Sequence, residues 1–333
     1  MFRLQVKNLL FYLGSTGLGQ YFGRPFREKG AILCYHRVLP HAEAVNLQGQ
    51  KRNLAVSDRC FDEHLKHLKD NYQVISMDEM HEHILSNSDE FYVAITFDDG
   101  YKDNLDFALP LLEKYDLPAT VYITTRFPEG DGWMWWYEAE DFVVENDTIN
   151  FSYNRFSINT TMKTNQEKQK CYYHLRDFLI NNKESIQKSF LSALTGMKIR
   201  EDYSELMLNW DEIRRLDNHN LITIGAHTHS HHNLKILDES EKVSEIKISK
   251  QLLEESLDHS VNHFAYPFGS VNTTGEREFK FAAQLGFSTA VTTRFGFLKN
   301  SDVFSLNRLV LSGFGKMIEL EGKLSGFVSI FKS

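Results

Sequence analysis

The stretch Tyr-Val-Ala-Ile-Thr-Phe-Asp-Asp-Gly-Tyr at residues 92–101 is the strongest indication of the fold. Its first six residues are mostly apolar, aromatic or β-branched, which is typical of a buried strand. Two adjacent charges are not expected inside such a strand, so Asp98 and Asp99 should emerge at its carboxyl end, and Gly100 should allow the turn that follows. Neighbouring side chains of an extended chain point to opposite sides, so one aspartate could bind a cation while the other acts as a base. The alternative is an acidic turn in which an aspartate caps the next helix.

Strands of the same type recur along the chain, and helical patterns separate most of them. The helical patterns include residues 57–71, with Ser57 as the N-cap, and a shorter helix capped by Asp78. Such alternation implies a parallel sheet, and the length of the chain favours a closed, distorted (β/α) barrel of seven to eight strands. The predicted strands are residues 30–35, 73–77, 92–97, 119–125, 221–226, 261–266, 288–293 and 305–311.

The alternation is lost between about residues 126 and 209 and resumes cleanly afterwards. This segment starts with three tryptophans and contains a predicted hairpin at residues 148–160, followed by a mainly helical part. We therefore expect one large insertion in a single domain of residues 26–320. Residues 1–25 are expected to form a separate N-terminal amphipathic segment.

Composition excludes several classes of protein. The chain has 333 residues and a formal net charge of −8, and that charge argues against a nucleic-acid partner, whose backbone would repel it. Three cysteines are an odd number at no metal-binding spacing, which indicates reduced thiols in a cytoplasmic protein. No run of eighteen apolar residues occurs, so no membrane-spanning helix is expected.

The first 23 residues mix apolar side chains with Arg3 and Lys7. A signal peptide would need a cleaner apolar core and a small-residue cleavage site, so we expect no export. Two alternatives remain open for this segment: an amphipathic helix resting on the inner surface of the membrane, or a helix packed against the domain. The expected location is the cytoplasm, with peripheral membrane contact under the first alternative.

Polar residues gather at the predicted strand ends. His36 follows the first strand, Asp98 and Asp99 the third, and the run at residues 227–232 contains four histidines. Closure of a barrel would bring these ends to one mouth, where the active sites of such barrels lie. Two histidines four residues apart and one carboxylate would form a catalytic zinc site with open positions for water and substrate. The alternative for the histidine run is a polar surface loop.

Three motifs occur in order: Thr-Phe-Asp-Asp-Gly at residues 96–100, His-Thr-His-Ser-His-His-Asn-Leu at 227–234 and Phe-Ala-Tyr-Pro-Phe-Gly at 264–269. Together they resemble the polysaccharide deacetylase family, also called the NodB-homology or carbohydrate esterase 4 family. The resemblance covers roughly residues 30–311, apart from the insertion. It implies a distorted barrel and metal-dependent removal of N-acetyl groups from sugars, which is hydrolysis of a carbon–nitrogen bond that is not a peptide bond.

The resemblance also implies roles for individual residues. Asp98 matches the catalytic base, and the backbone N–H of Phe268 matches the donor that stabilises the oxyanion. One divalent cation is implied, with zinc expected and nickel, cobalt and manganese as alternatives. Its ligands would be Asp99, His227 and His231, and the expected substrate contacts are Tyr101, Tyr266 and Trp133. The cluster of Trp133, Trp135 and Trp136 could instead be core or lid packing.

Two departures from the commonest family pattern shape the expectations. Ala265 stands where an arginine usually orients the base, as in a Phe-Ala-Tyr-Pro branch associated with exopolysaccharides and surface glycans. In that branch a late arginine follows, which Arg308 resembles; the alternative is an arginine on the surface. After His263 the chain has no histidine, although the family usually has its acid near the C-terminus. In the branch that this chain resembles, an early Tyr-His pair takes over that role, so the resemblance implies that His36 of the Tyr35-His36 pair is the acid, with His229 and His232 as competitors.

The leading hypothesis is a hydrolase that removes acetyl from an N-acetylated sugar, whether free, polymeric or lipid-linked. A metal-activated water would attack with Asp98 as the base, and His36 would protonate the leaving amine. One alternative keeps this machinery but cleaves an O-acetyl ester or a formyl group. The alternative of another class is an inactive family member that binds glycans through its tryptophan cluster.

Overall fold

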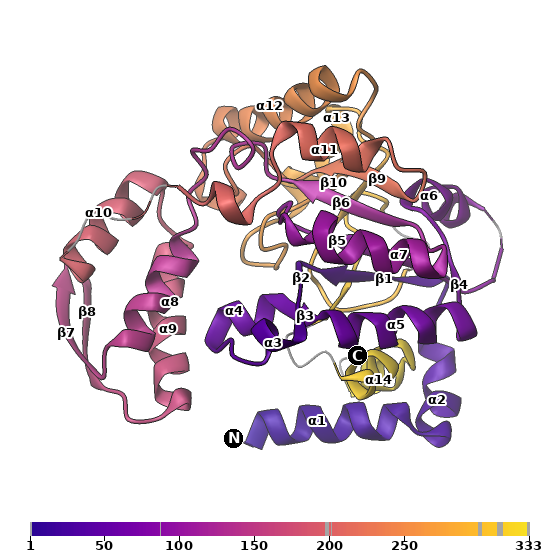
Figure 1. The fold of residues 1–333 in the computed structure, drawn as a ribbon, viewed down its shortest axis with the longest axis horizontal. Helices are drawn as coiled ribbons and strands as arrows, with labels where there is room; N and C mark the ends of the chain where they lie inside the picture. The colour runs from indigo at the N-terminus through magenta and orange to yellow at the C-terminus, as the bar shows by residue number, and fades with distance from the viewer. Residues whose placement is uncertain are drawn as a thin grey trace.

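The computed structural model describes residues 2–86, 88–196, 200, 202–298, 302–311 and 316–331. At its centre is a parallel sheet in the order β11-β10-β9-β6-β5-β1-β12, with β4 paired to the start of β5 (Figure 1). The strands are β1 (Gly30–Tyr35), β4 (Gln73–Val74), β5 (Tyr92–Phe97), β6 (Ala119–Ile123), β9 (Ile222–Ala226), β10 (His263–Ala265), β11 (Thr289–Val291) and β12 (Leu309–Val310).

The sheet curls into a barrel that one irregular segment closes. Leu306 forms a parallel bridge with Val291 of β11, and three residues later Leu309 pairs with Leu33 of β1. The predicted barrel is therefore confirmed. The predicted continuous strand at residues 305–311 is wrong, because the chain changes its neighbour between Leu306 and Leu309 and only Leu309–Val310 form a strand.

Alternating residues of the strands face the two sides of the sheet, as pleated backbone requires. Leu33 and Ile95 belong to the main core under the outer helices, whereas Ile32 and Ala94 belong to a smaller core on the other face. The sheet is thus buried on both faces, which explains why the strands read as nearly continuous apolar runs.

Helices connect most of the strands. They are α5 (Asp58–Asn71), α6 (Met77–Leu85), α7 (Leu109–Tyr115), α11 (Trp210–Asp217), α12 (Glu239–Leu257) and α13 (Glu276–Gln284), with a π-helical turn at Asn104–Ala108 before α7. Shorter elements are β2 (Arg37–Leu39) paired with β3 (Ala55–Ser57), α3 (His41–Ala44), α4 (Gly49–Leu54), and 3₁₀ turns at Ser204–Leu206 and Leu234–Ile236.

Helix starts follow the capping rules, with one correction. The predicted cap Ser57 accepts a hydrogen bond from the N–H of Cys60. Asp78 does not cap α6: Ser76 is the N-cap, and its backbone N–H donates to Glu79 in a reciprocal capping box. Asp78 lies inside the first turn instead, and its carboxylate lies 3.0 Å from Nε2 of His263.

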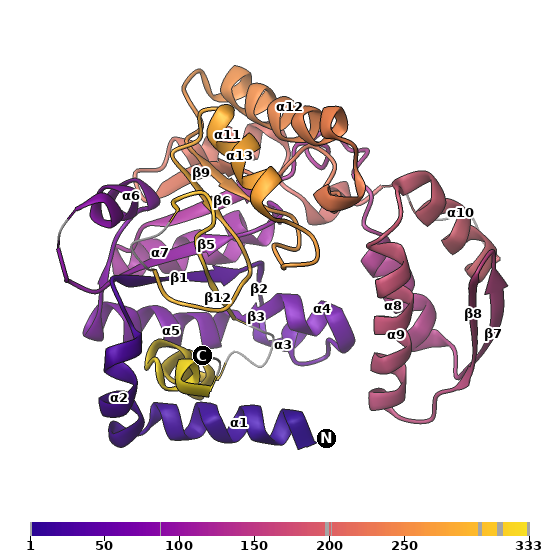
Figure 2. The ribbon, with the colours of Figure 1, turned by 180° about the vertical axis from the view of Figure 1, so that it is seen from behind.

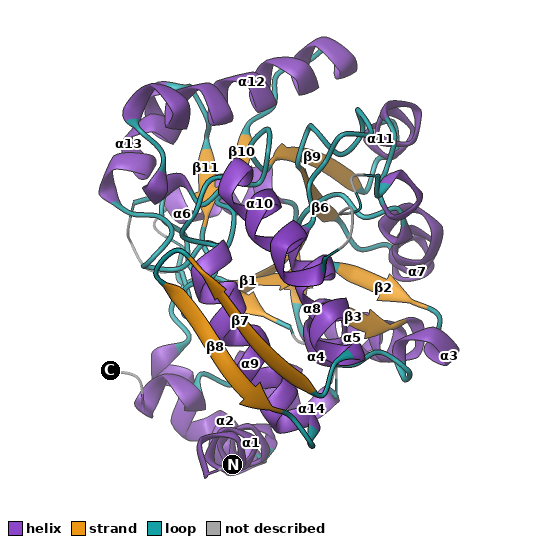
Figure 3. Cartoon of the chain, turned by 90° about the vertical axis from the view of Figure 1, so that its left-hand side faces the viewer, coloured by secondary structure: helices purple, strands orange, loops and turns teal. Residues whose placement is uncertain are grey.

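The segment between β6 and β9 forms a body of its own. It contains α8 (Trp135–Glu145), β7 (Thr148–Tyr153), β8 (Phe156–Thr161), α9 (Asn165–Leu179) and α10 (Glu184–Thr195). β6 and β9 pair directly with each other, so the chain leaves and re-enters the barrel between adjacent strands. The segment has a separate hydrophobic cluster that includes Leu175 and Phe190. Figure 3 shows its hairpin projecting beside α9 and α10.

The two ends of the chain pack together on the outside of the barrel. α1 (Phe2–Ser15) lies alongside α14 (Met317–Leu324), and α2 (Gly17–Gly23) leads through a 3₁₀ turn at Arg24–Phe26 to β1 (Figure 2). A second 3₁₀ turn covers Phe327–Phe331. The approach of α1 to α14 requires glycine at position 322, because a Cβ there would lie 2.6 Å from the backbone of Phe11. No helix of the described residues is long and apolar enough to cross a bilayer.

Candidate active site

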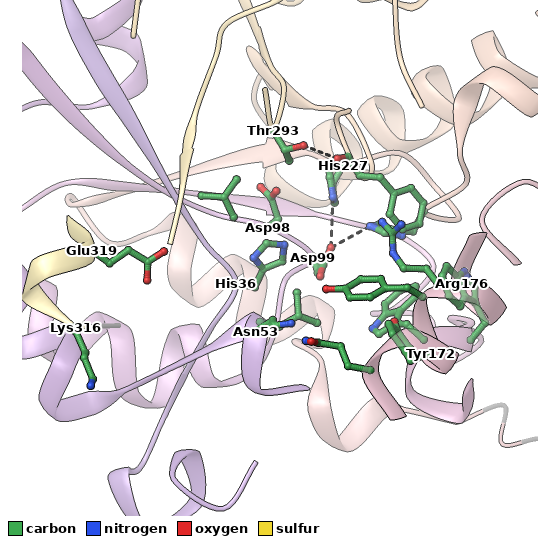
Figure 4. Close-up of a pocket in the computed structure, with 18 of the residues that line it drawn as sticks. His36, Asn53, Asp98, Asp99, Tyr172, Arg176, His227, Thr293, Lys316 and Glu319 are labelled. Atoms are coloured by element: carbon green, nitrogen blue, oxygen red, sulfur yellow. Dashed lines mark hydrogen bonds and ion pairs between the residues drawn. The ribbon is translucent and has the colours of Figure 1, made fainter. Parts of the chain in front are cut away.

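The polar residues predicted at the strand ends meet at the carboxyl mouth of the barrel. His36 follows β1, Asp98 and Asp99 follow β5, and His227 follows β9. Figure 4 shows these four residues grouped at the centre of one cavity, with Lys316 and Glu319 on one side and Tyr172 and Arg176 on the other.

Asp99, His227 and His231 place three ligand atoms close together. The Nε2 atoms of His227 and His231 lie 3.4 Å and 3.2 Å from the same Oδ1 atom of Asp99. Two ligands at zinc bonding distance, at the corners of a tetrahedron, are separated by roughly 3.3–3.6 Å, so these separations suit one shared ion. The Nδ1 of His227 lies 2.8 Å from the carbonyl oxygen of Ala265. A histidine whose Nδ1–H donates to a carbonyl keeps its Nε2 lone pair for a metal.

The electrostatics of these three residues also fit a cation. All three side chains are buried, and Oδ1 of Asp99 has no hydrogen-bond donor among the described residues. Burial alone would raise the pKa of Asp99, but the neighbouring His231 and His227 hold it well below its usual value. Burial lowers the pKa of His227, and the carboxylates of Asp99 and Asp98 more than compensate and raise it. A buried, unsatisfied carboxylate facing two imidazoles suits a divalent ion better than a structural hydrogen-bond network.

The two aspartates are held in different ways. Asp99 has a left-handed backbone, with φ of 77°. Asp98 instead receives two hydrogen bonds from Arg308, 2.7 Å to Oδ1 and 2.6 Å to Oδ2. Neither accepts a capping bond from the following helical turn, which begins at Asn104. The alternative of a helix-capping acidic turn is therefore wrong.

Arg308 is completely buried, which excludes the alternative of a surface arginine. Its Nε donates to the carbonyl of Thr292 at 2.8 Å, and one further nitrogen donates to the hydroxyl of Thr96 at 3.1 Å. Burial would raise the pKa of Asp98, but the guanidinium of Arg308 outweighs it and keeps the pKa below its usual value. Arg308 thus holds Asp98 ionised and fixed in orientation.

A second cluster, formed by Cys34, His36 and Asp98, is less suited to a metal. The thiol of Cys34 lies 3.5 Å from Oδ2 of Asp98, and burial raises its pKa well above the usual value. A protonated thiol is a poor ligand, and both oxygens of Asp98 are already taken by Arg308. His36 and Asp98 nevertheless lie close together.

His36 reaches the cavity from the first strand, as predicted. Its backbone carbonyl accepts a 2.8 Å bond from the side chain of Asn104, and its Nδ1 is buried with no partner among the described residues. Burial lowers the pKa of His36, although Asp99 and Asp98 oppose the shift. The competitors do not line the cavity: His229 lies 2.9 Å from the hydroxyl of Thr125, and the ring of His232 lies 3.9 Å from Glu184.

Phe268, the predicted oxyanion donor, lines the cavity. Its backbone is left-handed, with φ of 59°, and among the described residues its N–H has no acceptor. Its ring lies 4.7 Å from the ring of His231. The N–H is therefore available to bind an oxygen atom of a ligand beside the ring of His231.

The three predicted substrate contacts are not at the cavity, which corrects their expected placement. The indole N–H of Trp133 donates to Gln187 at 3.0 Å inside the segment between β6 and β9. Tyr101 is fully buried beneath the guanidinium of Arg37, 4.9 Å from its ring centre. Tyr266 is also fully buried and donates its hydroxyl to the carbonyl of Phe304. Each of these side chains is packed in the core and does not line the cavity.

Other residues line the cavity that sequence reasoning did not select. The cavity has a volume of about 1060 Å³, and Trp135 and Trp136 form part of its wall. The ring of Trp136 lies 5.0 Å from that of His231. From α9 the cavity receives Gln169, Tyr172, Tyr173 and Arg176. Their spacing of three and four residues marks one face of a helix, and this was the signal available in the sequence.

Comparison with known proteins places the chain among deacetylases. A family model described as polysaccharide deacetylase matches residues 86–290. YxkH of Bacillus subtilis (strain 168), assigned to the polysaccharide deacetylases, is 35% identical over 95 residues. That match covers 28% of this chain and 30% of YxkH.

Solved structures of deacetylases have a similar fold. The Streptococcus pyogenes deacetylase PplD, solved in complex with acetate, matches 90% of this chain and 99% of its own, with a TM-score of 0.59 and 20% identity. A de-N-acetylase from Aggregatibacter actinomycetemcomitans matches 88% of this chain and 99% of its own, with a TM-score of 0.56 and 15% identity. The polysaccharide deacetylase BC0361 from Bacillus cereus matches 89% of this chain and 69% of its own, with a TM-score of 0.54 and 19% identity.

Proposed function

Since the chain belongs to the polysaccharide deacetylase family, whose members are hydrolases of carbon–nitrogen bonds, we propose that it removes N-acetyl groups from an N-acetylated sugar with the help of one divalent cation. The sugar would be part of a polysaccharide, an oligosaccharide or a lipid-linked glycan. One observation carries the proposal: a group of side chains suited to a metal ion and a fixed carboxylate lie in the same cavity. The first is formed by Asp99, His227 and His231. The second is Asp98, which Arg308 holds by two hydrogen bonds.

Asp99, His227 and His231 would hold the cation, and zinc is the ion that this donor set favours. When bound, the ion would supply an electrophile and lower the pKa of water to near neutrality. Nickel, cobalt and manganese are the alternatives that metal analysis would distinguish.

The remaining steps belong to residues of the chain. Asp98, kept ionised by Arg308, would accept the proton of the attacking water. The N–H of Phe268 would donate to the carbonyl oxygen of the acetyl group as negative charge develops there. His36 would protonate the leaving amine. Because its pKa is lowered, His36 is neutral near pH 7 and must gain a proton during turnover before it can act as the acid.

The walls of the cavity suggest where the sugar lies. Trp135, Trp136 and Tyr172 line the cavity together with the catalytic groups, whereas Trp133 does not, so we propose that the sugar lies against these three side chains. These side chains belong to the segment that we propose to be an insertion at about residues 126–209 in a domain of residues 26–320. Its separate hydrophobic cluster supports that division.

We also propose a cytoplasmic enzyme in which residues 1–23 touch the inner surface of the membrane. The free thiols of Cys34, Cys60 and Cys171 support a reducing compartment. Cell fractionation tests this location, and export of the protein with a cleaved N-terminus would contradict it.

The test of the function is turnover of a panel of acetylated saccharides by purified protein of measured metal content, with the Asp98→Asn variant as the matched control. We expect release of acetate from an N-acetyl sugar and about 10²-fold or greater loss in the variant, as for removal of a general base. The variant should retain its metal, and loss of metal together with activity would mean that Asp98 is a ligand.

Other outcomes of the turnover assay would support the alternative functions. Turnover only of O-acetyl or N-formyl substrates would make the protein an esterase or deformylase on the same fold. Binding of glycans without turnover in a metal-loaded protein would make it an inactive member of the family.

A further inference from the structure

Exposed apolar side chains are concentrated on α1 and α2. Fourteen large hydrophobic residues are exposed among the described side chains, and six of them lie between residues 9 and 22. Leu18, Tyr21 and Phe22 are 73%, 71% and 56% exposed. Figures 1 and 2 show both helices at the edge of the molecule, on the outer side of α14. This surface, formed by Leu9, Tyr12, Leu13, Leu18, Tyr21 and Phe22, is here called the N-terminal apolar face.

The charge of this region differs from that of the whole chain. The first 27 residues contain four basic and no acidic residues, although the formal net charge of the chain is −8. Aromatic and aliphatic side chains next to basic residues are the composition of helices that lie in the headgroup region of a bilayer. Basic residues near such a helix attract anionic lipids, by about 1 kcal/mol for each residue close to the surface.

One residue of the N-terminal apolar face also lines the active-site cavity. Tyr12 is 57% exposed and also lines the cavity, together with the neighbouring, buried Phe11. Across from α1, Ile318 at the start of α14 is 41% exposed and lines the same cavity, next to the exposed Lys316. Among the described residues, the end of the cavity nearest this face is therefore lined by apolar side chains and by the charged Lys316 and Glu319.

The two ends of the cavity differ in character. The catalytic groups lie between the α1–α14 end and the α9 end, as Lys316 and Glu319 on one side and Tyr172 and Arg176 on the other show (Figure 4). The α9 end presents the polar Gln169 and Arg176 along with two tyrosines. The α1–α14 end presents the apolar Phe11 and Ile318 with Tyr12, and it also carries Lys316 and the buried Glu319, whose carboxylate pairs with Lys323. A substrate with a glycan at one end and a lipid at the other would match this polarity.

We propose that the enzyme rests on an anionic bilayer through its N-terminal apolar face and takes its acetylated sugar while the sugar is still attached to a membrane lipid through a phosphate. The lipid end enters between α1 and α14, past Tyr12, Ile318 and Lys316, and the sugar reaches Asp98 and Asp99. This inference rests on the proposed function and names its substrate class. It also gives a reason for the position of α1 against α14, since the same helix contacts the bilayer and lines the cavity.

The test compares one headgroup in two forms. The membrane form is a glycolipid in which N-acetylglucosamine is joined through a phosphodiester to a long alkyl chain, in vesicles of phosphatidylcholine and phosphatidylglycerol. The soluble form carries a methyl group in place of the chain. The variant is the double substitution Leu18→Asp and Phe22→Asp, at exposed positions that do not line the cavity. The control is Leu85→Asp on α6, where Leu85 is 68% exposed and also outside the cavity.

We expect the wild type to sediment with the vesicles and to turn over the glycolipid at least tenfold faster than the methyl analogue at equal bulk concentration. The double variant should lose at least tenfold in vesicle binding and in glycolipid turnover, while its turnover of the methyl analogue stays within about twofold. Leu85→Asp should behave as the wild type in every measurement.

Failure of this inference differs from failure of the proposed function. Equal turnover of both forms by the wild type, or vesicle binding by the double variant at the wild-type level, overturns the inference and leaves deacetylation standing. Vesicle binding without turnover of either form by metal-loaded wild type contradicts the proposed function. Self-association through the N-terminal apolar face, seen as a dimer in solution that the double substitution abolishes and that does not bind vesicles, also overturns the inference.

Discussion

Replacing Arg308 with methionine removes the positive partner of a buried carboxylate while keeping an apolar side chain in the space. In the wild type, Arg308 makes two bonds to Asp98 of 2.6 Å and 2.7 Å, and the two side chains are 0% and 3% exposed. Removal of one partner from a buried ion pair typically destabilises a protein by about 3–5 kcal/mol, because the other charge stays buried and unpaired.

The expected size of the effect can be converted into two observables. With an unfolding entropy of about 2.1 cal/mol/K for each residue of a chain this long, a loss of 3–5 kcal/mol lowers the Tm by roughly 4–7 °C. Loss of the guanidinium would also raise the pKa of Asp98, because Arg308 would no longer oppose the effect of burial. Asp98 acts as the base in its ionised form, so turnover by the variant should fall, and the acidic limb of its pH profile should move to higher pH.

The sign of the pH dependence is a further check. In the wild type the pKa of Asp98 is lowered, so its ionisation stabilises the fold above the unfolded-state pKa, and this contribution is lost as the pH falls through the folded-state pKa. In the variant burial raises that pKa, so the folded state loses stability as the pH rises above the unfolded-state value. The difference in Tm between the two proteins should therefore be largest near pH 7.5 and should shrink towards pH 4.5.

The assay is thermal unfolding of four proteins: wild type, Arg308→Met, Asp98→Asn and the double variant. Each single variant leaves one buried polar group without its partner, whereas the double variant removes both charges, so the double variant should be more stable than the sum of the single losses predicts. Additive losses, or an Arg308→Met protein as stable as the wild type at pH 7.5, would show that the ion pair does not hold Asp98 as we describe.

Three further predictions follow from the site and from the packing. The double variant His227→Ala and His231→Ala should lose its stoichiometric metal in elemental analysis; a full complement of metal would place the ligands elsewhere. His36→Ala should retain metal and lose about 10²-fold or more of amide turnover, but less on an acetyl ester with an activated leaving group, which departs without a proton. Equal losses on the two substrates would give His36 a structural or binding role. Phe190→Ala should lower the free energy of unfolding by about 3–5 kcal/mol in a denaturant titration, since its buried ring contacts four other aromatic rings; a loss below 1 kcal/mol would contradict this packing.

Several features of the active site could be predicted because they depend on neighbouring residues in the chain. Asp98 and Asp99 follow a strand that is buried on both faces, so their charges must lie beyond its end. His36 follows β1 for the same reason, and the carboxyl ends of parallel strands lie at one edge. His36, Asp98 and Asp99, and His227 after β9, could therefore be placed at one edge without any knowledge of how the loops fold.

The errors concern aromatic residues, for which local sequence is ambiguous. Trp133 and Trp135 are two positions apart, yet one is bonded to Gln187 in a core and the other lines the cavity. Tyr101 and Tyr266 follow motif residues directly but are fully buried. An aromatic ring near a catalytic motif can serve packing or binding equally well, and the choice depends on which neighbours enclose it.

The sequence by itself determined the strand-and-helix alternation and the emergence of carboxylates and histidines at the strand ends, because hydrophobic periodicity and the cost of burying charge act over a few residues. Only the tertiary structure decided that Arg308 meets Asp98, 210 positions away. That contact depends on closure of the barrel by the segment between Leu306 and Leu309. The walls of the cavity were likewise decided by packing of α1, α9 and α14 around the mouth. Contacts between remote segments depend on how whole elements pack, and they produce no periodic pattern in the sequence.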